Sequence, residues 1–268
     1  MKFNFVSKRN HGFWFDLIIV LLLALSLLSA CNDIDPATEA AQAKTMAVDV
    51  TPTSPVELPD DSTPAADLSV KYSFPDKIEP EGRYLLYLHG KIIENEGVYA
   101  VSPEYGPYEY EETLGYFADA GFNVISEVRS ANTDAYVYSD RVVSQINSLI
   151  EQGVPGENIT VVGFSKGGWI AISTSSKLRN PRVNFVLIAI CGDEINKTPR
   201  FSLAGRILSL YEKSDEYGST CKPLVERSRN VTGFEEIEFT TGLRHGAFYA
   251  ADPTWLEPLI SWLNEEGT

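Results

Sequence analysis

A serine stands between two glycines in the motif Gly-Phe-Ser-Lys-Gly at 163–167. An apolar run typical of a buried strand, 159–162, leads directly into the motif, and a helical pattern over 166–178 follows it. A turn from strand to helix presents a side chain at its tip, and the glycines let the helix pack closely on the strand. The first amides of the helix face the same point and favour negative charge there. The pattern therefore predicts that Ser165 is a nucleophile.

A second motif, Leu-His-Gly-Lys at 88–91, follows the first strongly apolar run of the chain. Together the two motifs resemble the α/β-hydrolase fold superfamily, in its serine-esterase-like form, over about residues 70–268. In that family a His-Gly turn points a backbone amide at the substrate carbonyl. The resemblance implies an oxyanion hole formed by the backbone N–H groups of Lys91 and Lys166. The fuller His-Gly-Gly-Gly form is absent, so the identity of the first donor stays open.

The resemblance also implies a general base. The family carries its catalytic histidine in the loop between the last strand and the last helix, and His245 lies there, within 241–247. The other two histidines are accounted for, because His11 lies in the N-terminal signal and His89 in the oxyanion turn. We therefore expect His245 to take the proton from the serine hydroxyl.

The third member of the predicted triad is an acid. Asp215 lies a few residues beyond the strand predicted at 206–211, where similar hydrolases carry it, and the chain order Ser165, Asp215, His245 matches the order of the family. Its role is to hold the imidazole tautomer and to stabilise the imidazolium. Three other carboxylates compete with it on sequence alone, and the choice between Asp215 and Asp193 stays open. The competitors are Glu212, Glu216 and Asp193, the last of which follows the preceding strand.

Three further residues are predicted at the same edge of the sheet. Cys191 ends a strand there, and Cys221 lies six residues past Asp215. Outside the cytoplasm these two thiols are expected to form a disulfide that pins the acid loop. Arg129 follows another strand on this edge and is a candidate for binding a substrate carboxylate, with a structural loop residue as the alternative.

Strands and helices are predicted to alternate along 71–268. Strands are expected at 83–88, 122–128, 158–162, 182–190, 206–211 and 235–240, and helices at 108–120, 134–152, 166–178 and 254–264. The alternation predicts an α/β fold with a mainly parallel sheet and helices on both faces. The most apolar strand, 182–190, is expected near the centre. The acidic and aromatic stretch 91–107 is expected to form a pocket rim, and no insertion is long enough for a large lid domain.

Residues 1–30 are predicted to be a lipoprotein signal peptide. A basic start is followed by an apolar run from Leu17 to Leu28, which is short for a spanning helix of roughly 20 residues. The run ends in Leu-Ser-Ala-Cys at 28–31, which resembles a bacterial lipobox. The resemblance implies cleavage before Cys31 and lipidation of its thiol. Asn32 after the cysteine resembles the signal for release to the outer membrane, facing the periplasm or the exterior.

Residues 31–70 are predicted to be an extended tether. The stretch is rich in Pro, Ala and Thr, and its residues 32–70 hold eight acidic residues against one base, Lys44. It shows no period of a helix or a strand. A chain of this composition cannot bury enough apolar surface to offset its ordering entropy. The folded domain is therefore expected to begin at about residue 71.

The composition excludes several classes of protein. The chain has 22 Lys and Arg against 37 Asp and Glu, a net charge of −15, and no visible basic patch, which argues against a nucleic-acid partner. A hydrophobic content of 44% excludes a collagen or a wholly disordered chain. The three cysteines lack the spacing of a zinc site, and no metal or organic cofactor is implied. No protein partner can be inferred.

These observations predict a lipid-anchored serine hydrolase of the bacterial cell envelope. The expected substrate is a small molecule with a carboxylic ester or related acyl bond, cleaved through an acyl-enzyme. A peptidase or acyltransferase on the same triad is one alternative. A non-catalytic binding protein on this scaffold is another, since a fold alone does not determine function. The substrate itself is not determined by the sequence.

The lipobox resemblance can be tested directly. Labelled palmitate is expected to enter the protein in bacterial cells, and Cys31→Ala should abolish the labelling because the acceptor thiol is lost. Gel fluorography of the purified protein measures the incorporation. Equal labelling of the variant and the parent would contradict the prediction.

Overall fold

The structure is a computed structural model that describes residues 71–265. The signal predicted at 1–30, the tether predicted at 31–70 and the lipidation site Cys31 lie outside these residues and stay predictions. Within the described range, no helix is both long enough and apolar enough to cross a membrane.

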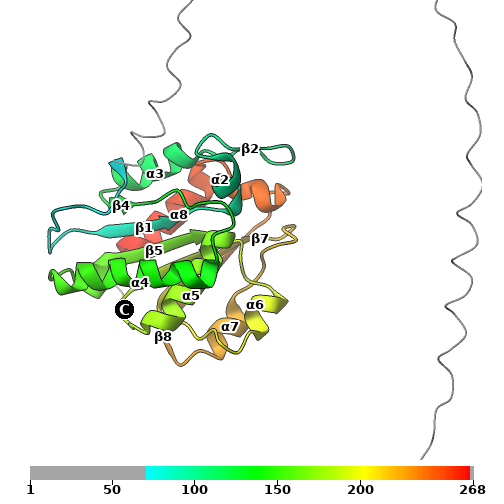
Figure 1. The fold of residues 1–268 in the computed structure, drawn as a ribbon. Helices are drawn as coiled ribbons and strands as arrows, with labels where there is room; N and C mark the ends of the chain where they lie inside the picture. Colours follow the sequence, from blue (N-terminus) through cyan, green and yellow to red (C-terminus); the bar gives the residue numbers. More distant parts are fainter. Residues whose placement is uncertain (1–70, 266–268) are drawn as a thin grey trace, which may run out of the picture. The chain divides into compact units, whose positions relative to one another are not determined.

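A six-stranded sheet forms the centre of the described domain (Figure 1). Its strand order is β4-β1-β5-β6-β7-β8, and every neighbouring pair is parallel. The parallel α/β architecture is therefore confirmed, and the most apolar predicted strand, β6, lies near the middle of the sheet. The strands are β1 (Tyr84–Leu88), β4 (Asn123–Ile125), β5 (Ile159–Phe164), β6 (Asn184–Ile188), β7 (Ala204–Glu212) and β8 (Asn230–Phe239).

Helices cover both faces of this sheet. α3 (Tyr110–Asp119) and α8 (Pro253–Asn264) pack in one hydrophobic cluster, and α4 (Ala135–Glu151) and α5 (Lys166–Leu178) pack in a second one. In Figure 1, α4 lies in front of the sheet and α8 behind it. Side chains of a strand alternate between the two faces, so Leu85 of β1 enters the first cluster and Leu86 enters the second.

α4 illustrates how the local sequence sets a helix. Val142, Ile146 and Leu149 recur at helical spacing and are fully buried, so they form the stripe that faces the sheet. The carboxylate of Asp134 accepts a hydrogen bond of 2.8 Å from the backbone N–H of Val137 and caps the first turn. The prediction of a helix over 134–152 is confirmed to within a residue at each end.

Several short elements near the carboxyl ends of the strands were not predicted. The expected pocket rim at 91–107 is a helix, α2 (Lys91–Glu96), followed by the antiparallel pair β2 (Val101–Ser102) and β3 (Gly106–Pro107). α6 (Asp193–Lys197) and α7 (Lys222–Glu226) follow β6 and β7. Each of these elements is too short to show an apolar period, so sequence pattern alone could not reveal them.

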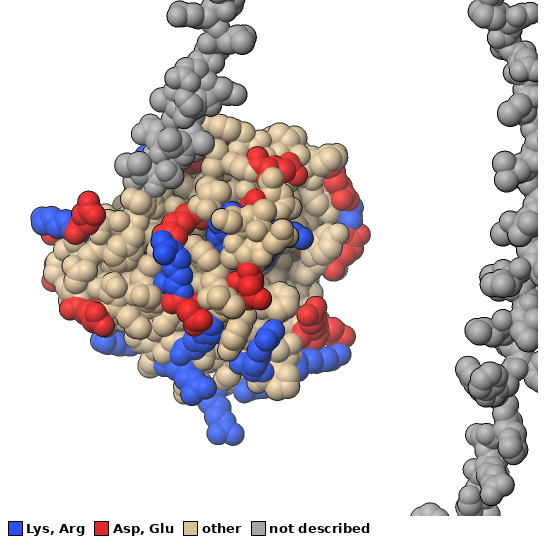
Figure 2. Space-filling model, viewed as in Figure 1, with Lys and Arg blue, Asp and Glu red and all other residues tan. Residues whose placement is uncertain are grey.

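The face drawn in Figure 2 carries both signs of charge. Lys and Arg side chains gather mainly in its lower half, and Asp and Glu side chains are spread over both halves. Opposite charges pair locally on the surface, as in Lys197 with Asp193 at 2.8 Å and Arg141 with Glu127 at 2.6 Å. Exposed pairs of this kind contribute little to stability, typically below about 1 kcal/mol.

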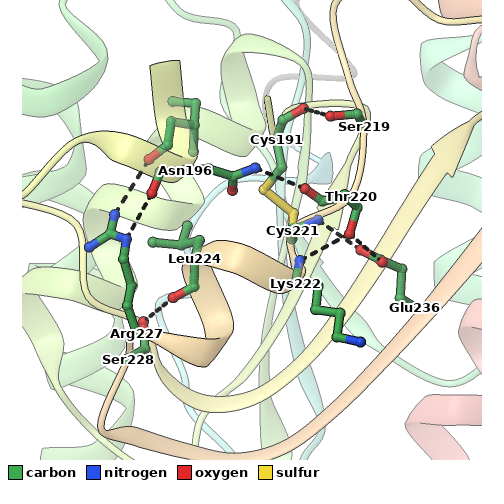
Figure 3. Close-up of a disulfide and its surroundings, with 11 residues drawn as sticks. Cys191, Asn196, Ser219, Thr220, Cys221, Lys222, Leu224, Arg227, Ser228 and Glu236 are labelled. Carbon is green, nitrogen blue, oxygen red and sulfur yellow. Dashed lines mark hydrogen bonds between the residues drawn. A yellow bond between two sulfur atoms is a disulfide. The ribbon is translucent and has the colours of Figure 1, made fainter. Parts of the chain in front are cut away.

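A disulfide joins Cys191, just after β6, to Cys221, at the start of α7 (Figure 3). Both cysteines are buried. Figure 3 also shows the carboxylate of Glu236 from β8 accepting from the backbone N–H of Cys221 at 2.8 Å and from the hydroxyl of Thr220 at 2.6 Å. The segment that leaves β7 is therefore tied to β6 by a covalent bond and to β8 by hydrogen bonds.

We predict that loss of this disulfide destabilises the protein by roughly 3–4 kcal/mol. The two cysteines are 30 residues apart, and opening a loop of about this size restores chain entropy to the unfolded state. Chemical denaturation of the oxidised protein and of a Cys191→Ala/Cys221→Ala variant measures the difference. Added reductant should leave the double variant unchanged. Two freely alkylatable thiols in protein purified under oxidising conditions would contradict the pairing.

Candidate active site

Ser165 lies at the turn between β5 and α5 in a strained backbone conformation. Its φ is 53° and its ψ is −117°, a region that residues with a side chain rarely occupy and that costs of order 1–3 kcal/mol. Its backbone N–H donates to the carbonyl of Ile188 at 2.9 Å, which fixes the turn to β6. The residue is partly exposed. The structure thus presents the serine at the carboxyl end of the central strands, as the motif predicted.

The two glycines of the motif are required by close backbone contacts. A Cβ at Gly167 would overlap the carbonyl oxygen of Leu88, and one at Gly163 would overlap the carbonyl oxygen of Gly167. These contacts bring the first turn of α5 against the ends of β1 and β5. Any side chain at either position would force the elements apart.

Asp215 and His245 form a hydrogen-bonded pair. The Oδ2 atom of Asp215 lies 2.8 Å from Nδ1 of His245, and the side chain of Asp215 is 0% exposed. Asp215 follows β7, and His245 lies in the turn Arg244–Phe248 before α8. The pairing leaves Nε2 of His245 directed away from the carboxylate, which is the arrangement that a general base needs.

The other carboxylates that competed for this position lie elsewhere. Asp193 is exposed and pairs with Lys197, and Glu216 is held by the guanidinium of Arg244. Glu212 is buried and binds backbone amides instead of the histidine. Among the four candidates, the structure brings only Asp215 to His245.

Aromatic rings surround His245. The ring of Phe164, the residue before Ser165, lies 4.9 Å from the imidazole between centroids, and Tyr217 lies 5.2 Å away. Tyr105 from the β2–β3 turn and Tyr249 lie at 6.2 Å and 6.5 Å. These contacts place His245 beside the serine turn. Within residues 71–265 the serine hydroxyl makes no hydrogen bond to it, and such bonds often tighten only when substrate is bound.

The predicted oxyanion donors stand at the first positions of α2 and α5. Gly90 precedes α2, and a Cβ there would lie 3.2 Å from the ring of Phe164 and 3.8 Å from the Cβ of Ser165. The turn at 89–91 therefore packs against the serine turn. The amides of Lys91 and Lys166 have no partner inside their own helices, because the first turn of a helix leaves its N–H groups free.

The side chain of Arg129, a candidate for binding a substrate carboxylate, is buried and directed inward. Its side chain is 1% exposed, and its Nε donates to Oε1 of Glu94 at 2.8 Å. Its guanidinium also donates to the carbonyl oxygen of His89. The one guanidinium nitrogen without a hydrogen-bond partner among the described residues, Nη1, is also buried, so the structure favours the structural alternative for Arg129.

His89 is a neutral, buried residue. Its Nε2 accepts the backbone N–H of Arg129 at 3.1 Å, so Nδ1 carries the proton and donates to the carbonyl of Gly90 at 2.8 Å. Burial, together with the positive charge of Arg129, lowers the pKa of His89 to about 3. The histidine therefore fixes the turn at 89–91 through its backbone contacts and does not exchange protons in the usual pH range.

Glu212 is a site residue whose role the sequence did not show. It is 1% exposed at the end of β7, and its carboxylate accepts from the backbone N–H groups of Ser214 at 2.6 Å, Thr241 at 2.9 Å and Gly242 at 3.0 Å. Burial by itself raises the pKa of Glu212, but hydrogen bonds from these residues outweigh it and hold the pKa below its ordinary value. The carboxylate thus joins the loop of Asp215 to the loop of His245. The one sequence signal for this role was the position of an acidic residue at the end of a predominantly apolar strand, β7.

No protein-family model matches the chain. An acetyl-hydrolase from Streptomyces hygroscopicus is 28% identical over 111 residues, a match that spans 41% of this chain and 35% of the length of that protein.

Solved structures with a similar fold include a candidate α/β hydrolase from Agrobacterium tumefaciens, with 16% identity over 70% of this chain and 88% of that one and a TM-score of 0.48. The α/β hydrolase MGS-M1 from a Medee basin deep-sea metagenome has 17% identity over 70% and 88%, with a TM-score of 0.47. The chain itself combines a parallel sheet, a serine turn after a central strand and the order Ser, Asp, His. It has the α/β-hydrolase fold.

Within residues 71–265, no group of three or more His, Cys, Asp or Glu side chains is placed to hold a metal ion. The functional groups that the structure does bring together are a serine, a histidine paired with a carboxylate, and two helix amides. This set is suited to acyl transfer.

The burial of His89 predicts an acid-sensitive contribution to stability. Its pKa is about 3 in the folded protein against about 6.5 unfolded, so below pH 6.5 the unfolded chain binds a proton that the folded chain does not. The contribution of His89 to the free energy of unfolding is therefore present above pH 6.5. It is lost as the pH falls, by about 2 kcal/mol between pH 7 and pH 5.

Denaturant unfolding at the two pH values measures this loss. His89→Gln keeps an amide donor and acceptor but does not titrate, so its pH dependence should be flatter than that of the parent by the same amount. Equal pH dependence of parent and variant would contradict the buried neutral histidine.

Proposed function

We propose that this protein is a serine hydrolase that cleaves a carboxylic ester or a related acyl bond. The observation that carries the proposal is the Asp215–His245 pair, at 2.8 Å, beside the strained turn of Ser165. A protein that only binds a ligand does not need a buried carboxylate that orients a histidine beside a partly exposed serine. The conformational strain at the serine is also typical of functional positions.

The geometry supports the following reaction. His245 takes the proton of the Ser165 hydroxyl, whose oxygen attacks the substrate carbonyl and forms a tetrahedral intermediate. The amides of Lys91 and Lys166 donate to its oxyanion. The intermediate collapses, the alkoxide leaves with the proton from His245, and an acyl-enzyme remains. Water, deprotonated by His245, then attacks the acyl carbonyl. When this second tetrahedral intermediate collapses, the bond to the serine oxygen breaks, His245 returns the proton to that oxygen, and the carboxylic acid leaves.

The acyl group is proposed to be short. The similarity to an acetyl-hydrolase, over 35% of that protein, favours a small acyl chain. The aromatic rings of Tyr105 and Tyr217 lie 6.2 Å and 5.2 Å from the imidazole between centroids, and we propose that they border the acyl group. A panel of p-nitrophenyl esters from acetate to octanoate, with matched amides and lactones, tests both the bond type and the chain length.

Variants of the triad are expected to lose activity in a fixed order. Ser165→Ala should lower kcat by as much as about 10⁶-fold, and His245→Ala should do nearly the same because the hydroxyl is a poor nucleophile without its base. Asp215→Asn should cost on the order of 10⁴-fold, since the base remains but loses its orientation. Steady-state kinetics on the best ester of the panel measure each change.

Asp193→Asn is the matched control, because it removes an exposed carboxylate from the alternative position and should retain the parental kcat. A fluorophosphonate probe should label the parent at Ser165 and fail to label Ser165→Ala. The proposal is wrong if Ser165→Ala hydrolyses every substrate of the parent at the parental rate.

A further inference from the structure

A buried ion cluster lies behind the predicted oxyanion turn. It consists of Glu94, Arg129 and Lys166, and it is called the Glu94 cluster below. The carboxylate of Glu94 is 0% exposed; its Oε1 accepts from Arg129 at 2.8 Å, and its Oε2 is paired with the ammonium of Lys166. The Arg129 side chain is 1% exposed and that of Lys166 17%. The reaction proposed above uses none of these three side chains.

The three side chains come from three different segments. Glu94 lies in the first turn of α2, three residues after Lys91. Lys166 is the first residue of α5 and follows Ser165 directly. Arg129 follows β4 and also donates to the carbonyl oxygen of His89 in the turn before α2. One carboxylate therefore connects the two segments that carry the proposed oxyanion amides.

Burying an ion cluster of this kind costs free energy and adds little net stability to the fold. Removing charged groups from water carries a free-energy penalty, and an apolar contact of similar size often gives equal or greater stability. A paired charge does, however, fix direction and distance, because each oxygen has one donor at a set position. The ion pairs of the Glu94 cluster thus fix the distance between the two turns more closely than apolar packing would.

The cluster also carries an excess of positive charge. Arg129 and Lys166 contribute two positive charges against one negative charge on Glu94, and the neighbouring His89 is neutral for the reason given above. Glu94→Gln raises this excess and Lys166→Met lowers it, so a purely electrostatic effect on the developing oxyanion would change kcat in opposite directions in the two variants, whereas a loss of positioning lowers kcat in both.

We propose that Glu94 is a positioning residue of the oxyanion hole, which holds the first turns of α2 and α5 at a fixed separation through its ion pairs with Lys166 and Arg129. The inference rests on the proposed function, since it concerns the transition state of that reaction. Glu94 does not touch the substrate. It acts through the amides of Lys91 and Lys166.

Three variants separate positioning from simple structural support. Lys166→Met removes the ammonium but keeps the amide, and it leaves Glu94 paired with Arg129, so the fold should survive. Lys166→Arg restores a cation at the same carboxylate. Glu94→Gln keeps the shape and one acceptor oxygen but removes the charge on which both cations depend.

We expect kcat to fall about ten- to hundred-fold in Lys166→Met and in Glu94→Gln, with KM changed by less than about three-fold, because the loss is confined to the transition state. Lys166→Arg should recover most of the rate. The double variant Glu94→Gln/Lys166→Met should be no slower than the slower single variant, since both changes break one connection.

Glu127→Gln is the matched control. Glu127 lies two residues before Arg129 and pairs with Arg141 at 2.6 Å on the surface, so its loss removes a similar ion pair outside the cluster. Its kcat should equal that of the parent. The rate of fluorophosphonate labelling of Ser165 gives a second readout, because the phosphonylated serine resembles the tetrahedral intermediate, and it should fall in proportion to kcat.

The outcomes distinguish this inference from the function on which it depends. A parent that hydrolyses esters while Lys166→Met and Glu94→Gln retain its kcat would overturn the positioning role alone. Variants that melt at a lower temperature but keep the parental kcat and labelling rate would also overturn it, since support of the fold would then be the whole effect. A parent inert to every ester and to the probe would overturn the proposed function and this inference with it.

Discussion

The contact between the first turn of α5 and the end of β1 is the constraint on which the site depends. Gly167 lies so close to the carbonyl oxygen of Leu88 that no side chain fits between them. This approach brings the serine turn against the turn at 89–91, and it is maintained although Ser165 has a φ of 53°. The sheet and its two covering layers hold the strained turn in place, because central parallel strands buried on both faces are the most rigid part of such a fold.

Three buried carboxylates organise the loops that meet at this edge. Asp215 binds His245, Glu212 binds amides of the loops on either side of β8, and Glu94 joins the first turns of α2 and α5. A buried carboxylate is stable only when its oxygens are fully paired. Each one therefore requires two segments of chain to stay together, and the disulfide at Cys191 adds a covalent restraint to the same region.

The long elements followed from the sequence more closely than the short ones. The helix predicted over 166–178 has the same bounds in the structure, since its apolar period and its flanking turn both mark its ends. β8 begins at Asn230, five residues before the predicted start, because pairing with β7 extends it through a half-exposed stretch of weak pattern. The sequence predicted the correct edge of the sheet for Arg129, but its side chain points inward to Glu94. The position of a residue after a strand does not determine the direction of its side chain.

By itself the sequence determined the order of the long strands and helices along the chain, the serine turn and the candidates for base and acid. Those features are local, because they depend on apolar period, on glycine and on residue type within a few positions. Only the tertiary structure decided that Asp215 faces His245, 30 residues away, and that Glu94 pairs with Lys166 across 72 residues. Contacts between distant segments arise from how the loops pack at the edge of the sheet, and no pattern along the chain encodes the direction in which a buried charge points.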